Sequence, residues 1–165
     1  MREIDIQTGI NKIMGPITLV GAKYNNKHNV MTASWVTQVS FEPPLIAVSV
    51  GPDKYTHDLI ANAKEFVVSI LDESQREIAD YCGGRGGDQA DQICAEKVNT
   101  APASKIETPL LTGCIANLEC QLEQSMSAGD HTLFVGRVIK AHGESEDKPM
   151  AYYDGKIFAS NLKSI

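Results

Sequence analysis

The chain has 165 residues, of which 42% are hydrophobic and 22% charged, a composition typical of globular domains and unlike disordered, collagen-like or coiled-coil proteins. Fifteen Lys and Arg against twenty-one Asp and Glu give a formal net charge of −6, which argues against a sequence-independent nucleic-acid binder. No apolar run reaches the ~20 residues that span a bilayer and no signal peptide opens the chain, so we expect one cytoplasmic domain, residues 1–165, without a membrane partner.

Short β-branched runs between turn residues predict a series of strands. In chain order they are expected at 17–20, 30–40, 45–50, 66–71, 115–124 and 131–142. Asn25-Asn26 and Gly129-Asp130 predict turns, and Asp154-Gly155 predicts a hairpin within 152–159. Pro43-Pro44 should interrupt the sheet, because proline has no N–H to donate.

Two short helices are predicted between the strands. Thr56 is the expected N-cap of a helix that runs to Ala63, and Ser74-Gln75-Arg76-Glu77 has the form of a capping box for a helix that runs to Tyr81. Residues 88–109 are polar and predict an irregular surface segment with at most one short helix. Because no long helices alternate with the strands, the pattern favours a mainly β, antiparallel, closed or nearly closed barrel over a doubly wound sheet.

The cysteines and histidines do not have the spacing of a metal site. The four cysteines are Cys82, Cys94, Cys114 and Cys120. Their spacing matches no zinc template, and the four histidines are scattered singly, so we expect no metal and mostly buried thiols in a reducing compartment.

Three segments carry polar residues where a strand core would not require them. In the first, Thr32-Ala33-Ser34-Trp35 with Thr37 and Ser40, small residues and hydroxyls would let a flat ligand approach the backbone. The alternative is an ordinary amphipathic strand whose threonines face water. The segment therefore indicates a candidate binding surface and leaves that alternative open.

The second segment, Ser49 to His57, passes from a strand end through Gly51 into a helix start. Helix N-terminal amides together with Lys54 suit an anion, although N-capping threonines such as Thr56 are common where no phosphate binds. The sequence contains neither a Walker A motif nor Gly-x-Gly-x-x-Gly, which excludes the P-loop and Rossmann interpretations.

The third segment places His131 directly after the Gly129-Asp130 turn. An imidazole can exchange a proton near neutral pH, so His131 is a candidate proton donor or ligand-ordering group. A partly exposed polar residue at a strand start is the alternative.

In this order and spacing, Thr32–Trp35, Ser40–Leu45, Lys54–His57 and Gly129–Gly136 resemble the flavin reductase-like family of FMN-binding split barrels. The resemblance runs from about Gly15 to Gly155. It implies an antiparallel, Greek-key split β-barrel that forms a homodimer and binds FMN near the dimer interface.

By match to the family motifs, the resemblance also assigns residues. His131 would be the catalytic residue, beside the flavin where a nicotinamide approaches. The ring and ribityl chain would be lined by Thr32, Ala33, Ser34 and Trp35; the ribityl and phosphate end by Ser49, Val50, Gly51, Lys54 and Thr56; and the ring would be covered by Tyr152 and Tyr153. Thr37, Ser40 and His57 complete the candidate cofactor-binding set.

The chain departs from part of the family at one motif. Many two-component flavin reductases have Asn-Ser where this chain has Ser34-Trp35. At this motif the chain therefore resembles the flavoredoxins more than those reductases. None of the four motifs contains a cysteine, so thiol-dependent acceptor chemistry is not carried over.

The resemblance implies an enzyme that uses NADH or NADPH as a transient co-substrate to reduce FMN, or an acceptor through bound FMN. The alternative is a flavoredoxin-type electron carrier with tightly bound FMN, little NAD(P)H turnover and a redox-protein donor; a binding or sensing protein on the same barrel is a third. Because the net charge is negative, binding of FMN and NADH would require local positive charge, near Lys54 and Arg85. The position of residues 88–109 in the chain suits a flap over the site.

Overall fold

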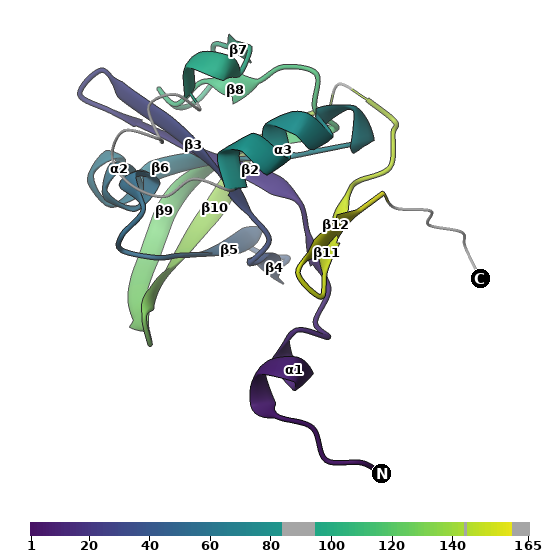
Figure 1. Cartoon of the computed structure of the whole chain (residues 1–165). Coiled ribbons are helices and arrows are strands. Elements are labelled where there is room, and N and C mark those ends of the chain that lie inside the picture. The colour runs from purple at the N-terminus through teal and green to yellow at the C-terminus, as the bar shows by residue number, and fades with distance from the viewer. Residues whose placement is uncertain (84–94, 144, 160–165) are drawn as a thin grey trace.

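The computed structural model of the chain describes residues 1–83, 95–143 and 145–159 (Figure 1). The strands are β1 (Gly15–Pro16), β2 (Thr18–Tyr24), β3 (Lys27–Ala33), β4 (Val36–Ser40), β5 (Leu45–Val50), β6 (Glu65–Ile70), β7 (Thr100–Ala101), β8 (Leu110–Leu111), β9 (Ala116–Ala128), β10 (His131–Gly143), β11 (Ala151–Tyr153) and β12 (Lys156–Phe158). The helices are α1 (Ile6–Ile10), α2 (Tyr55–Ala63), a 3-10 turn (Glu73–Gln75) and α3 (Arg76–Gly83). The mainly β prediction is confirmed.

Seven strands form one antiparallel sheet in the order β3-β2-β6-β9-β10-β5-β4. Its two edge strands, β3 and β4, are separated in the chain by Ser34 and Trp35 alone. Two residues can join opposite edges only if the sheet curls round until the edges meet, so the sheet is rolled into a barrel. We call the junction at Ser34 and Trp35 the seam.

Two cores lie on opposite faces of β2, because successive side chains of a strand point to opposite sides. Val20 faces the barrel interior, where it joins Phe66 and Phe134 in a cluster that α2 covers. Leu19 faces outward into a second cluster with Ala79 of α3. A smaller sheet, β1-β11-β12, lies beside α3 (Figure 1).

The predicted single strand over 30–40 is wrong. The segment is divided at the seam because its two halves pair with different neighbours: β3 with β2, and β4 with β5. The turns at Asn25-Asn26, Gly129-Asp130 and Asp154-Gly155 are all present, and Asn25, Asn26, Gly129, Asp154 and Gly155 have the positive φ that such turns demand. The break at Pro43-Pro44 also separates β4 from β5 as predicted.

Both predicted helices exist, but both predicted caps are wrong. The N-cap of α2 is Lys54, and Thr56 lies inside the first turn, buried, where its hydroxyl accepts a hydrogen bond from Asn29 Nδ2 at 2.8 Å. Before α3, Asp72 caps the 3-10 turn by accepting from the Ser74 backbone N–H at 2.8 Å. A carboxylate two residues upstream has replaced the expected serine in the capping role.

The sequence analysis did not predict α1, which stands away from the barrel and buries no residue (Figure 1). Asp154 holds the segment after α1, since its carboxylate pairs with Lys12 at 3.2 Å and its N–H donates to Asn11 O at 3.3 Å. Within the described residues no helix is long and apolar enough to cross a membrane.

Candidate functional site

At the seam the backbone of Ser34 and Trp35 lies close to β5 and β1. Ser49 N–H donates to Trp35 O at 3.0 Å. A Cβ at Gly15 would lie 2.3 Å from Ser34 O, so only glycine lets β1 approach the seam this closely. The Trp35 side chain points away from the barrel core and is 60% exposed.

A cavity of about 830 Å³ opens beside the seam. Five of the predicted cofactor-binding residues line it: Ser34, Trp35, Thr37, Ser49 and Tyr152. The rest of its wall comes from Val36 of β4, from β5 and β10, from the segment 7–16 and from the tip of the β11–β12 hairpin. Its size is within the about 300–1,000 Å³ range of small-molecule sites. The seam thus combines a largely apolar wall with a few hydroxyls.

His131 lies next to this cavity through its contact with Trp35. The two rings are 4.8 Å apart and tilted by 48°. His131 Nδ1 donates to Asp130 Oδ1 at 2.8 Å, and this hydrogen bond lowers the pKa of the Asp130 carboxyl. Because a carboxylate only accepts, Nδ1 carries a proton, and Nε2 makes no hydrogen bond within the described residues.

His57 is already engaged inside the protein. Its Nδ1 donates to Asp58 Oδ1 at 3.1 Å, and its Nε2 lies 2.9 Å from Thr132 Oγ1. The ring packs edge-on against Phe134 with centroids 5.2 Å apart. These contacts attach His57 to the strand that carries His131, and its cofactor-binding role stays a prediction.

Of the predicted ribityl and phosphate end, Ser49 lines the 830 Å³ cavity, whereas Val50, Gly51, Lys54 and Thr56 do not. Lys54 Nζ pairs with Asp53 Oδ2 at 3.1 Å, and their hydrogen bond lowers the pKa of the Asp53 carboxyl. The Thr56 hydroxyl is buried against Asn29. The phosphate role of Lys54 stays a prediction, and Arg85 lies outside the described residues.

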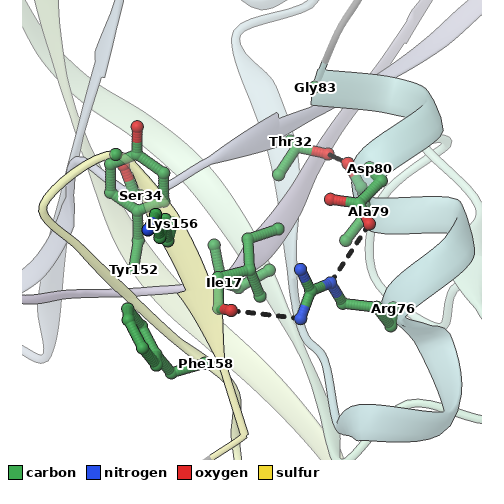
Figure 2. A pocket seen from close by; sticks show the side chains of 12 residues that line it. Ile17, Thr32, Ser34, Arg76, Ala79, Asp80, Gly83, Tyr152, Lys156 and Phe158 are labelled. Carbon is green, nitrogen blue, oxygen red and sulfur yellow. Dashed lines mark hydrogen bonds and ion pairs between the residues drawn. The ribbon is translucent and has the colours of Figure 1, made fainter.

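A second cavity, of about 550 Å³, lies between α3 and the β11–β12 hairpin (Figure 2). It is lined by Ile17, Thr32, Ser34, Arg76, Ala79, Asp80, Gly83, Tyr152, Gly155, Lys156, Ile157 and Phe158. Ser34, Tyr152 and Gly155 also line the first cavity, so the two adjoin. Sequence reasoning missed Arg76 and Lys156 as cavity residues, because neither belongs to a ligand-binding motif and only the fold brings them to one wall.

The remaining predicted residues do not line either cavity. Ala33 and Val50 are buried in the barrel core, and Ser40 ends β4. Gly51 is close to His131, because a Cβ there would lie 3.7 Å from Nε2. Tyr153 packs on Phe158, with ring centroids 6.4 Å apart.

The predicted flap falls partly outside the described residues, at 88–94. In the described part, Ser104 and Lys105 donate backbone N–H groups to Glu119, and Glu107 and Thr108 donate theirs to Glu65. None of residues 95–109 lines either cavity. This part of the segment is attached to β6 and β9 and lies outside both cavities.

The cysteines of the described ranges are buried: Cys82, Cys114 and Cys120. Burial, with a smaller effect of the neighbouring Glu119 charge, raises the pKa of Cys120 to about 12, so this thiol stays protonated. Across 1–83, 95–143 and 145–159 no cluster of three His, Cys, Asp or Glu could hold a metal ion. Cys94 is not among the described residues.

Comparison with known proteins identifies the architecture. The chain superimposes on the NADH:FAD oxidoreductase of Streptomyces globisporus with a TM-score of 0.86 and 26% identity, covering 98% of this chain and 99% of that one. A flavoredoxin from Methanosarcina acetivorans gives 0.87 and 25%, covering 99% and 94%. An FMN-binding protein from Thermus thermophilus gives 0.86 and 27%, covering 100% of both chains.

The sequence model described as "Flavin reductase like domain" matches residues 10–160, nearly the whole chain. That span includes the seam, His131 and every residue that lines the two cavities except Gln7. The chain therefore belongs to the flavin reductase-like family.

Proposed function

We propose that this flavin oxidoreductase binds FMN at the seam and reduces it, or an acceptor through it, with NADH or NADPH. The observation that carries the proposal is the 830 Å³ cavity where Ser34, Trp35, Thr37 and Ser49 meet. Its apolar wall suits a flat ring system, and its hydroxyls and seam backbone suit the polar edge of that ring. The similar proteins whose names include FMN-binding protein and NADH:FAD oxidoreductase support the same class.

In this proposal the residues have distinct tasks. Ser34, Thr37 and Ser49 hold the flavin edge, and Trp35 with Tyr152 limits water at the ring. When bound, FMN supplies the hydride-accepting centre. His131 orients the nicotinamide, and Nε2 holds or moves a proton there, while Asp130 fixes the orientation of the ring by accepting from Nδ1.

The first experiment follows the visible spectrum of the protein as FMN is added, then as NADH or NADPH is added without oxygen. We expect saturable FMN binding, and flavin bleaching on NAD(P)H addition. His131→Ala should slow bleaching by about 10²-fold while FMN stays bound, the scale of a lost proton-transfer group. Added imidazole should restore part of the rate.

Two results would contradict the proposal. Unchanged single-turnover bleaching in His131→Ala would remove His131 from the nicotinamide step. Flavin that binds but is reduced only by a ferredoxin-like donor would favour the electron-carrier alternative, which the similarity to a flavoredoxin supports.

We also propose that two chains form a homodimer through exposed apolar side chains at the two ends of β4 and in the N-terminal segment. Ile6 (82% exposed), Ile13 (74%) and Phe41 (87%) add to the exposed Trp35. Exposed large apolar residues are typical of an interaction surface. In this proposal the second chain lies beside the cavity, because Ile13 and Trp35 line it.

Light scattering of the purified protein should therefore give twice the chain mass of 17.9 kDa. Phe41→Asp should shift the mass toward one chain and weaken FMN binding, because a buried unpaired charge opposes association. Tyr24→Asp, which alters an exposed aromatic residue on β2, is the control and should leave the dimer intact. A wild-type monomer that binds FMN would refute the dimer.

A further inference from the structure

The two ring nitrogens of His131 have different surroundings. Nδ1 donates to Asp130 Oδ1 at 2.8 Å, whereas Nε2 makes no hydrogen bond within the described residues. The side chain is 27% exposed, so water reaches only part of the ring. The charges near Nε2 therefore influence how readily this nitrogen holds a proton.

Asp53, in the loop between β5 and α2, brings a second carboxylate to the Nε2 side of this ring. A Cβ at Gly51 would lie 2.5 Å from Asp53 Oδ1 and 3.7 Å from His131 Nε2. Oδ1 and Nε2 thus surround one point, and their separation cannot exceed those two distances laid end to end. Because Gly51 has no side chain, the space at this point stays open.

Lys54 holds the Asp53 carboxylate from its other oxygen. Its Nζ pairs with Asp53 Oδ2 at 3.1 Å, which leaves Oδ1 beside Gly51 and His131. The hydrogen bond and the charge of Lys54 lower the pKa of the Asp53 carboxyl, and the charge of His131 adds to this lowering. Asp53 is therefore ionised at neutral pH.

The titratable and charged groups around His131 come from the β9–β10 turn, the loop after β5 and the start of α2. They are Asp130, Asp53, Lys54, His57 and Asp58. In α2, His57 Nδ1 donates to Asp58 Oδ1 at 3.1 Å, which keeps that carboxylate beside His57. The carboxylates close to the His131 ring are thus Asp130 and Asp53, and both favour its protonated form.

We propose that Asp53 is a positioning residue for His131, whose carboxylate favours a proton on Nε2 during the nicotinamide step. The inference rests on the proposed function, in which Nε2 holds or moves a proton. When Nε2 gives that proton to a ligand, its electron pair stays on the nitrogen and the neutral ring keeps its proton on Nδ1. Asp53 acts through His131 and needs no contact with flavin or nicotinamide.

Single-turnover bleaching of the flavin by NADH, without oxygen and at saturating FMN, tests this between about pH 6 and pH 9. Asp53→Asn keeps the size of the side chain and removes its charge. Bleaching should be near the wild-type rate at about pH 6 and about threefold slower at about pH 8 to 9, the scale of one solvent-screened charge. Asp53→Glu should recover most of the rate, and high salt should reduce the difference.

NMR of the flavin-free protein gives a readout that does not depend on turnover. The pH at which the His131 ring signals change should move lower in Asp53→Asn, because the protonated ring loses a favourable charge. The control is Asp58→Asn, which removes a carboxylate of matching exposure, 72% against 71%, that lies beside His57. It should leave the His131 signals and the bleaching profile unchanged.

Gly51→Ala tests the geometry directly. The new Cβ would meet the Asp53 carboxylate, which is exposed and can turn away, while its distance to His131 is an ordinary contact. We expect the same pH-dependent loss as in Asp53→Asn, and a double variant no slower than either single one.

The opposite results are distinguishable. A wild-type pH profile in Asp53→Asn, an equal loss at every pH, or additive losses with Gly51→Ala would overturn the role of Asp53 while His131 keeps its own. Wild-type bleaching in His131→Ala, or a protein that binds no flavin, would instead refute the proposed function.

Discussion

Replacing Glu119 by glutamine should lower the free energy of unfolding at pH 7 by about 3 kcal/mol, the scale for breaking a buried, hydrogen-bonded charge. Glu119 is fully buried, and its Oε1 accepts from Ser104 N–H at 3.0 Å, from Ser104 Oγ at 2.8 Å and from His142 Nε2 at 2.6 Å. Its Oε2 accepts from Lys105 N–H at 2.7 Å. A glutamine amide has only one acceptor oxygen, so its NH₂ group would face one of these donors.

The same contacts predict a pH dependence. Burial alone would raise the pKa of Glu119, but the hydrogen bonds from Ser104, His142 and Lys105 outweigh it and lower the pKa from 4.5 to about 2. A group whose pKa is lower in the folded than in the unfolded protein stabilises the fold at pH values above its unfolded-state pKa. This stabilisation is lost as the pH falls toward the folded-state pKa. The wild type should therefore lose about 3 kcal/mol between pH 4.5 and 2 through this group.

Urea unfolding at several pH values measures both effects. Glu107→Gln, at an exposed position of the same segment, is the control and should change stability by less than about 0.5 kcal/mol. Equal stability of Glu119→Gln and the wild type at pH 7, or the same acid dependence in both, would contradict the assignment.

Gly136→Ala should cost about 3 kcal/mol through overpacking inside the barrel. A Cβ at Gly136 would lie 2.5 Å from Phe66 Cζ, 2.6 Å from Phe66 Cε1 and 3.1 Å from Cys120 Cβ. The Phe66 ring is fully buried in the barrel core, so it has no open side into which to turn.

The matched control is Gly143→Ala in the same strand, where the nearest atom to a new Cβ is 3.9 Å away. It should leave the urea midpoint nearly unchanged. Phe66→Leu is destabilising alone, but it should recover stability in the Gly136→Ala background, since the smaller side chain removes the clash. Additive losses in the double variant would show that Phe66 is not the obstacle.

The parts of the fold that depend on local chemistry could be predicted from the sequence. Gly129-Asp130 and Asp154-Gly155 give hairpins because Gly129, Asp154 and Gly155 adopt the positive φ of tight turns. The order and alternation of apolar residues gave a mainly β fold. The predicted helix caps were wrong because the contacts of Thr56 with Asn29 and of Ser74 with Asp72 do not follow from the local sequence pattern.

The parts that depend on contacts between distant segments could not be predicted. The division at Ser34 and Trp35 follows from a change of partner strand, which a run of β-branched residues does not reveal. Arg76 and Lys156 are 80 positions apart in the sequence, and only the hairpin packing beside α3 brings them to one cavity. Of the predicted site, the residues at the seam come together, while Lys54 and Thr56 lie apart from both cavities.

At the seam, the backbone of Trp35 contributes to the fold of the barrel, whereas its side chain lines the cavity. Trp35 is largely exposed and takes no part in the buried cluster of the barrel, while its backbone carbonyl holds the edge strand through Ser49 N–H. Any residue supplies that carbonyl. A side chain at position 35 can therefore be exchanged for one of another size or polarity with little loss of folding stability, so new substrate preferences can evolve on this barrel by single substitutions.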